Sequence, residues 1–251
     1  MELQPHRVEY WLKAKPEDPE KFVAEVAEVC DLYREAQAME ENGVHLVSTD
    51  EKTGIQALER AAETIRMTPG QAERQESEYV RHGTQALIAN FVVATGEVIA
   101  PTIGATRTEE DFARHIAQTV DTDPDAEWIF IADQLNIHQS ETLVKLIAQR
   151  GDIKLELGEK GKSGILASMQ SRADFLKDKS HRIRFAYTPK HTSWLNQIEI
   201  WFSILVRKLL RRGSFSSVEE LKSRILSFID YFNKTMAKPY KWTYTGRPLA
   251  A

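Results

Sequence analysis

The chain has 251 residues, of which 42% are hydrophobic, so it can bury a sizeable core in one large domain or in a domain with appendages. Its one cysteine, Cys30, excludes an internal disulfide and any cysteine-rich zinc site. The sequence shows no secretory signal, and no apolar run approaches the roughly 18 residues of a membrane-spanning helix. We therefore expect a cytoplasmic protein that has no membrane partner.

Charged residues are distributed unevenly along the chain. The formal net charge of −4 argues against a simple nucleic-acid binder. However, residues 1–144 sum to −16, residues 145–212 to +9 and residues 213–251 to +3. An acidic first part followed by a basic part can offer a phosphate-binding face beside an acidic site. A solvated basic surface is the alternative that charge alone leaves open.

The first predicted element is a helix that begins near residue 18. Residues 1–18 lack a core of their own and are expected to be extended. Asp18 followed by Pro19 is typical of a helix N-cap and a first helical position. The helix has one apolar face, which we expect to pack on the elements that follow and which comprises Phe22, Val23, Val26, Val29, Cys30 and Tyr33.

Strand and helix patterns then alternate along the chain. Apolar runs predict strands at residues 44–49, 85–94, 97–103, 128–132 and 182–187, and Thr95-Gly96 fits a tight turn between the second and third. Helices are predicted over residues 108–120 and 140–150. This order indicates an α/β protein with a mixed five-stranded sheet and helices on its faces. It matches the ribonuclease H-like fold, in which the first and fourth strands are neighbours.

The last third of the chain is predicted to be helical and basic. A helix is expected around residues 164–177. Ser216 with Glu219 fits a capping box, and an apolar stripe from Val218 to Phe232 follows it. Beyond this helix, KPYKWTYTGRP interleaves basic and aromatic residues. Such a tail can follow a DNA backbone, contact a neighbouring subunit or pack on its own core.

Three acidic residues lie where a sheet and a helix are expected to meet. Asp50 and Asp133 each follow an apolar run typical of a buried strand, and Glu199 lies at the start of an amphipathic helix. Carboxylates gathered at strand ends and facing a helix can hold two hard divalent cations. A metal pair of this kind is the usual apparatus for in-line displacement at a phosphodiester.

Each of these acidic residues also has a purely structural interpretation. Asp50 fits a turn after a strand, and its neighbour Glu51 can be the ligand in its place. Asp133 can be the N-cap of the helix that follows it. Glu199 can close a capping box that begins at Asn196, in which case its carboxylate returns to the cap amide.

Four segments resemble one known family. STDEKTGIQALER, the stretch from RHGTQALIANF to GATRTEEDF, DQLNIHQS and TPKHTSWLNQIEIWFSIL are similar to the catalytic core of DDE transposases in the bacterial insertion-sequence branch of the mariner superfamily. The resemblance extends from about residue 5 to residue 248. In that family the metal ligands are an aspartate at the end of the first strand, an aspartate in a D-x-x-x-x-H context and a glutamate in an LN-x-IE segment.

The resemblance implies that Asp50, Asp133 and Glu199 are the catalytic ligands of two divalent cations, Mg²⁺ or Mn²⁺. It also implies the reaction, which is hydrolysis of DNA at transposon ends followed by attack of the freed 3′-hydroxyl on target DNA. The DNA partners would be the transposon ends and the target. The protein would associate with the bacterial nucleoid when it is bound to DNA.

Two features depart from the family pattern. First, 65 residues separate Asp133 from Glu199, roughly twice the spacing in many members, and the extra length lies at about residues 157–181. This basic insertion either contacts DNA or covers the core with solvated lysines. Second, family members usually have helix-turn-helix modules upstream of the core. The chain is therefore interpreted as truncated, domesticated or a catalytic fragment, with a homodimer and a separately encoded helix-turn-helix module among its expected partners.

A second set of residues is predicted to lie near DNA. His138 and His191 are candidates for contacting phosphate or for ordering the loop near the metals, and Lys190 for contacting a phosphate. The basic residues that precede Gly213 are predicted to meet DNA or to form a solvated helix end, and they are Arg207, Lys208, Arg211 and Arg212.

These patterns divide the chain into three parts: an N-terminal linker and helix at residues 1–43, the catalytic core at 44–212, and a C-terminal helix with its tail at 213–251. The helical end segments are appendages to the core. No G-x-x-x-x-G-K-[ST] loop is present, so ATP is not implied. Two other functions stay open: a ribonuclease H-like DNA nuclease without strand transfer, and a non-catalytic DNA-binding derivative.

Overall fold

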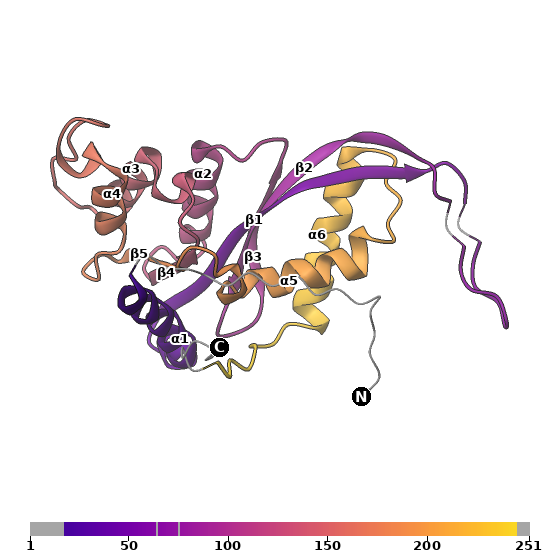
Figure 1. Ribbon diagram of the computed structural model, residues 1–251, viewed down its shortest axis with the longest axis horizontal. Helices are drawn as coiled ribbons and strands as arrows, with labels where there is room; N and C mark the ends of the chain where they lie inside the picture. The colour runs from indigo at the N-terminus through magenta and orange to yellow at the C-terminus, as the bar shows by residue number, and fades with distance from the viewer. Residues whose placement is uncertain (1–17, 64, 75, 245–251) are drawn as a thin grey trace.

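A five-stranded mixed sheet forms the centre of the computed structural model, which describes residues 18–63, 65–74 and 76–244 (Figure 1). The strand order is β3-β2-β1-β4-β5. β1 pairs antiparallel with β2 and parallel with β4, β2 pairs antiparallel with β3, and β4 pairs parallel with β5. This topology confirms the predicted ribonuclease H-like fold. The strands are β1 Val44–Arg60, β2 Tyr79–Val92, β3 Val98–Gly104, β4 Glu127–Ala132 and β5 Ile183–Tyr187.

Helices cover both faces of this sheet. α2, α3 and α4 bury one face, where Phe112, Leu143 and Phe175 pack on the strands. α1, α5 and α6 bury the other face, where apolar residues of α5 and α6 meet β1–β3 and those of α1 meet β1 and β4. None of the described helices is long and apolar enough to span a bilayer. The helices are α1 Pro19–Glu41, α2 Glu109–Val120, α3 Glu141–Arg150, α4 Met169–Leu176, α5 Ile198–Leu205 and α6 Val218–Thr235.

β1 is much longer than the predicted strand at residues 44–49. Its pairing with β4 ends at Ser48 and Ile131, but its pairing with β2 continues to Arg60 and Tyr79. The two strands therefore leave the body of the sheet as a long ribbon (Figure 1). This second half of β1 is mostly polar, although Ile55 and Ala57 are buried, so it lacks the apolar run from which a strand is predicted. Asp50 consequently lies inside a strand, and the turn interpretation of this residue is wrong.

Capping side chains decide where two helices begin. The helix predicted around residues 164–177 is a 3-10 turn at Gly164–Ala167 followed by α4, because Ser168 forms a capping box with Ser171. α6 begins one residue later than its predicted capping box. Ser217 is the N-cap and accepts from the amide of Glu220, whose carboxylate accepts from the amide of Ser216. The predicted start of α1, with Asp18 as N-cap and Pro19 in the first turn, is confirmed.

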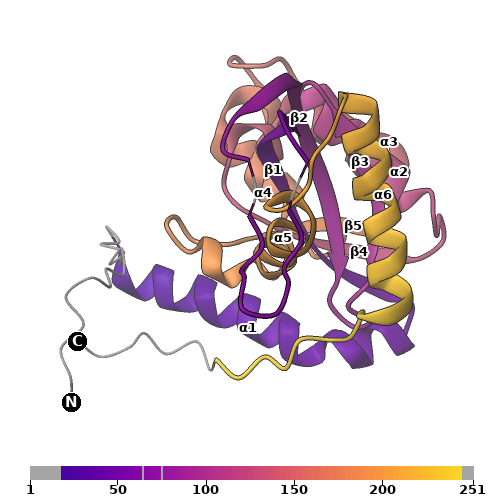
Figure 2. The same ribbon diagram turned by 90° about the vertical axis from the view of Figure 1, so that its right-hand side faces the viewer.

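The chain after α6 folds back over the face that α1 covers (Figure 2). Tyr240 stacks on Phe91 with ring centroids 4.6 Å apart, and Trp242 packs on Tyr33 at 4.7 Å. Tyr244 contacts the ring of Trp194, which is 51% exposed. These contacts favour the packing interpretation for the described part of the tail. Residues 245–248 of the tail and residues 1–17 lie outside the described part of the chain.

A glycine permits this tail to approach the sheet. Gly96 lies in the turn between β2 and β3 with φ +77°, and a side chain there would overlap the backbone of Lys238. Only glycine combines this backbone conformation with such a close contact. Glycine at position 96 therefore allows the tail to pack directly on the turn between β2 and β3.

We expect the tail to contribute to stability through its aromatic contacts. Trp242→Ala should lower the free energy of unfolding by roughly 2 kcal/mol, below the 3–5 kcal/mol typical of a fully buried tryptophan, because Trp242 is only half-buried. Denaturant unfolding followed by circular dichroism measures this loss. Tyr231→Ala, at an exposed aromatic residue of α6, is the control. Equal stability of the two variants would show that the tail is not part of the cooperative unit.

Candidate active site

Asp50 is a buried carboxylate on β1. It is 8% exposed and points toward the face that carries α5. Its Oδ1 accepts a hydrogen bond from the amide of Glu51 at 2.7 Å, and its Oδ2 accepts from Asn196 Nδ2 at 3.3 Å. Burial raises the pKa of Asp50 to about 7, and the nearby charges of Glu51 and Asp133 contribute to the rise. Asp50 is therefore a carboxylate whose negative charge is poorly compensated by the protein.

Glu51 points to the opposite face of the same strand, since successive side chains alternate across a sheet. Its side chain is 1% exposed, and Oε1 lies 2.9 Å from His138 Nε2. The second oxygen, Oε2, has no hydrogen-bond partner among the described residues, and Arg107 Nη1 lies 3.9 Å from it. The Glu51 carboxylate therefore contacts His138 and lies near Arg107, on the face of the sheet where α2 packs.

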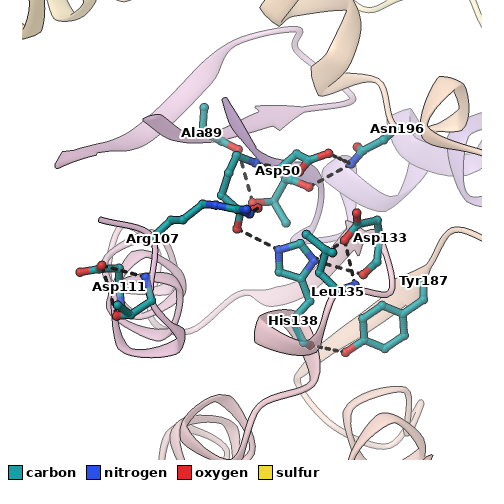
Figure 3. Close-up of polar contacts among 12 residues, drawn as sticks. Asp50, Ala89, Arg107, Asp111, Asp133, Leu135, His138, Tyr187 and Asn196 are labelled. Carbon is teal, nitrogen blue, oxygen red and sulfur yellow. Dashed lines mark hydrogen bonds and ion pairs between the residues drawn. The ribbon is translucent and has the colours of Figure 1, made fainter. Parts of the chain in front are cut away.

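His138 joins Glu51 to Asp133 (Figure 3). The His138 ring is fully buried, with Nδ1 2.7 Å from Asp133 Oδ1. Burial alone lowers the pKa of His138, but hydrogen bonds to Asp133 and Glu51 outweigh it and raise the pKa to about 10. Tyr187 donates from its hydroxyl to the backbone carbonyl of His138 at 2.7 Å. His138 therefore lies inside the protein between two carboxylates, which favours the predicted loop-ordering role over phosphate contact.

Asp133 directly follows β4, as predicted. Its side chain is 36% exposed. Burial raises its pKa, but the hydrogen bond to His138, its charge, the amide of Leu135 and the charge of Arg107 together lower it. Asp133 does not cap a helix, because Ser140 is the N-cap of α3 and Leu135 precedes the 3-10 turn Asn136–Gln139. The N-cap interpretation of Asp133 is therefore wrong.

Asn196 fastens the beginning of α5 to β1 (Figure 3). Its Nδ2 donates to the carbonyl of Thr49 at 3.0 Å as well as to Asp50, and its Oδ1 accepts from the hydroxyl of Ser48. The same hydroxyl accepts from the amide of Ile198 at 2.9 Å. From the sequence, Asn196 is predicted only as the first residue of a capping box. Its position in the LN-x-IE segment was the available signal for a role at the site.

Glu199 lies in the first turn of α5 and is half-buried. No side-chain cap hydrogen bond forms at the start of α5, so the capping-box interpretation is wrong. Burial raises the pKa of Glu199, while the charge of Lys52 lowers it and that of Asp133 raises it. Glu199 lines a hollow of about 410 Å³, and the other residues that line it are Lys52, Phe202, Ser203, Val206 and Arg207.

Asp50, Asp133 and Glu199 are neighbours, but they do not form a finished coordination shell. The charge of Asp133 contributes to the raised pKa of both Asp50 and Glu199, which places each of these two carboxylates within electrostatic reach of Asp133. Within residues 18–63, 65–74 and 76–244, no group of three or more histidine, cysteine, aspartate or glutamate side chains is arranged to hold a metal ion. The donor chemistry nevertheless fits a hard cation, because all three offer carboxylate oxygens and a cation would relieve their repulsion.

A family model described as DDE superfamily endonuclease matches residues 45–222. The chain belongs to this family. The match includes all three of the acidic residues described above, and it confirms the resemblance at the level of the superfamily. No curated protein matches the chain.

Solved structures of transposases are similar to this DDE endonuclease. One is a pre-cleavage Mos1 transpososome, with 11% identity and a TM-score of 0.49, which covers 91% of this chain. This chain covers 60% of that transposase chain. The catalytic domain of Mos1 mariner transposase has 10% identity and a TM-score of 0.49, with 88% of this chain and 85% of that chain covered.

The basic residues predicted to meet DNA lie on the surface of the DDE endonuclease. Lys190 and His191 are exposed in the loop after β5, and His191 has φ +64°. The four basic residues that precede Gly213 are also exposed, and one of them, Arg207, lines the hollow beside Glu199. Lys52 and Arg107 were not predicted. Lys52 follows Asp50 by two residues, whereas Arg107 had no signal beyond its charge.

We expect the Asp50 carboxylate to destabilise the metal-free DDE endonuclease at high pH. The unfolded chain releases this proton near pH 4 and the folded chain near pH 7, so the stability that the protonated group contributes is lost as pH rises through about 7. In EDTA, the stability gained by Asp50→Asn should increase by roughly 2–3 kcal/mol between pH 5 and pH 8. Denaturant unfolding at both pH values measures it.

Asp152→Asn, at an exposed aspartate, is the matched control and should show no such increase. A stability difference between Asp50→Asn and the wild type that is the same at pH 5 and pH 8 would contradict the raised pKa of Asp50.

Proposed function

We propose that this chain is the catalytic domain of a DNA transposase that cleaves DNA at transposon ends and transfers the cut strand to a target. The observation on which this rests is the meeting of Asp50, Asp133 and Glu199 from β1, the end of β4 and the start of α5 in a DDE endonuclease. Burial and the charge of Asp133 raise the pKa values of both Asp50 and Glu199, and a bound cation would relieve this cost.

In this proposal Asp50, Asp133 and Glu199 hold two Mg²⁺ or Mn²⁺ ions. When bound, these ions would supply a lowered pKa for the attacking water or 3′-hydroxyl and charge stabilisation for the departing oxygen. Asn196 orients the Asp50 carboxylate through its hydrogen bond to Oδ2. No side chain is then required as a nucleophile.

The DNA strand would run along the basic surface beside Glu199. Lys52 and Arg207 line the hollow next to the Glu199 carboxylate, so their cationic groups can neutralise phosphates that flank the reacting bond. Lys208, Arg211 and Arg212 extend this surface beyond α5. Lys190 and His191 would contact the strand from the loop after β5. All of these are sequence-independent contacts.

The proposed organisation follows the predicted boundaries. Residues 44–212 form the catalytic core, the segment at about 157–181 is an insertion, and residues 1–43 and 213–251 are appendages. A homodimer and a separately encoded helix-turn-helix module would supply the recognition of transposon ends. The protein would act in the bacterial cytoplasm, at the nucleoid.

Asp50→Asn, Asp133→Asn and Glu199→Gln should each abolish nearly all metal-dependent nicking of a transposon-end duplex. Double variants should lose little more than single ones, because ligands of shared metals fail as a unit. A nicking assay with Mg²⁺, Mn²⁺ or EDTA measures the loss, and circular dichroism confirms folding. The control is Glu59→Gln, on the exposed ribbon of β1 and β2. Full nicking by any one of the three site variants would remove that residue from the ligand set.

Strand transfer separates a transposase from a nuclease of the same fold. Precut ends with free 3′-hydroxyls should become joined to a target plasmid by the wild-type chain. Nicking without joining would identify a ribonuclease H-like nuclease. Retention of DNA binding without either reaction would identify a non-catalytic derivative.

DNA binding by this chain alone should be weak and nearly indifferent to sequence, with a dissociation constant on the order of 10⁻⁴–10⁻⁶ M at physiological salt. Replacing Arg207, Lys208, Arg211 and Arg212 by alanine should flatten the salt dependence, by about 0.9 in the logarithmic slope for each phosphate that is no longer neutralised. Titration of terminal-repeat and scrambled duplexes at several salt concentrations measures both properties.

Lys154→Ala with Lys179→Ala is the matched control, since both lysines are well exposed and lie outside the segment after α5. An unchanged slope in the quadruple variant would show that these four residues form only a solvated helix end. A tight, salt-tolerant preference for the repeat would show that the chain itself reads the transposon end.

A further inference from the structure

Two buried residues beside the proposed metal site have no assigned role in it. Glu51 and His138 are almost completely buried, at 1% and 0% side-chain exposure, yet both have charged or ionisable side chains. Burial of such groups is costly unless they are paired and hydrogen-bonded. The pair lies on the face of β1 opposite to Asp50 and reaches Asp133 through the imidazole ring.

His138 is held in place by four residues. Nε2 lies 2.9 Å from Glu51 Oε1, and Nδ1 lies 2.7 Å from Asp133 Oδ1 and 3.1 Å from the backbone carbonyl of Asp133. Phe112 packs on the ring with centroids 4.3 Å apart. Tyr187 holds the backbone carbonyl of His138 from β5. Since ionised carboxylates only accept hydrogen bonds, both ring nitrogens must donate.

These contacts constrain how Asp133 can bind a cation. Asp133 follows the last residue of β4 and is not part of a helix or strand, so its backbone is not held by a ladder of hydrogen bonds. The amide of Leu135 and the ring of His138 both donate to Oδ1. The carboxylate is thereby held by one oxygen, and Oδ2 is left for another ligand. Glu51, in turn, holds the ring in the orientation that makes this possible.

We propose that Glu51 and His138 are positioning residues, which hold Asp133 through one carboxylate oxygen so that the other binds the metal. Glu51 is then a partner of His138 and not an alternative ligand to Asp50. This inference depends on the proposed function, because it concerns the same cation site. It adds to that function a chain of hydrogen bonds from β1 through His138 to Asp133.

Mn²⁺ binding to the full chain, measured by electron paramagnetic resonance of the free ion, tests the proposal without DNA. Glu51→Ala and His138→Ala should each weaken Mn²⁺ binding by about 10–100-fold, which is typical when the partner of a ligand is removed. The double variant should bind Mn²⁺ no more weakly than either single variant, because the two residues act through one contact with Asp133. Glu51→Gln should bind nearly as well as wild type, since its amide oxygen still accepts from His138 Nε2.

The pair Glu59 and His82 provides a matched control. His82 Nε2 lies 2.6 Å from Glu59 Oε2, so this is also a hydrogen bond between a β1 glutamate and a histidine, but it joins β1 to β2 on the exposed ribbon. Glu59→Ala and His82→Ala should leave the Mn²⁺ affinity unchanged. Circular dichroism and thermal unfolding establish whether each variant is folded. If the alanine variants do not fold, Mn²⁺ binding is measured on Glu51→Gln and His138→Gln in their place.

Three results would overturn the inference, and they differ from failure of the proposed function. If Glu51→Gln loses as much Mn²⁺ affinity as Asp50→Asn, Glu51 is a direct ligand. If folded Glu51→Ala or His138→Ala binds Mn²⁺ as wild type does, the chain of hydrogen bonds is only structural. If Glu59→Ala causes the same loss, the effect is general. Absence of saturable Mn²⁺ binding by the wild type, with Asp50→Asn indistinguishable from it, would overturn the proposed function as well.

Discussion

Two adjacent carboxylates on one strand must point to opposite faces of the sheet, and the site is arranged around this constraint. Asp50 points toward α5 and meets Asn196, whereas Glu51 points toward α2 and meets His138. Each carboxylate therefore requires its own set of polar partners, and these come from different parts of the chain. The strand pair β1–β4 brings Asp133 close to both, because the parallel register ends at Ser48 and Ile131, two residues before Asp50 and Asp133 respectively.

The partners differ in how well they compensate charge. Glu51 and Asp133 share the imidazole of His138, and Arg107 lies 3.9 Å from Glu51, so cationic groups of the protein compensate part of their negative charge. Asp50 receives only an amide of Asn196 and a backbone amide, both of which are neutral donors. The protein thus leaves its uncompensated charge on Asp50 and beside Glu199. This imbalance supports the proposal that a cation binds there, because a stable fold alone would not require it.

Much of the fold could be predicted from the sequence because its central elements have strong apolar periodicity. The run Trp128–Ala132, the turn at Gly96 and the capping box at Thr108 each correspond to the predicted element. The polar half of β1 could not be predicted, since its polar and charged residues interrupt any apolar run and the alternating buried residues Ile55 and Ala57 are too few to mark a strand. Within the site, the three acidic residues could be predicted as candidates from their positions after apolar runs or at a helix start and from the family motifs. The burial of Glu51 could not be predicted, because a hydrogen bond to a histidine 87 residues away leaves no local sequence pattern.

The position of the aromatic tail affects how the protein is made as well as how stable it is. Chains fold in the order of their synthesis, with amino-terminal parts first. Trp242 packs on Tyr33, whose hydroxyl donates to the carbonyl of Leu195 just before α5. The segment that presents Glu199 is therefore supported by residues that are synthesised about 40 positions later. A nascent chain that has all three acidic residues still lacks this support, so the site is completed only after the tail residues have been synthesised.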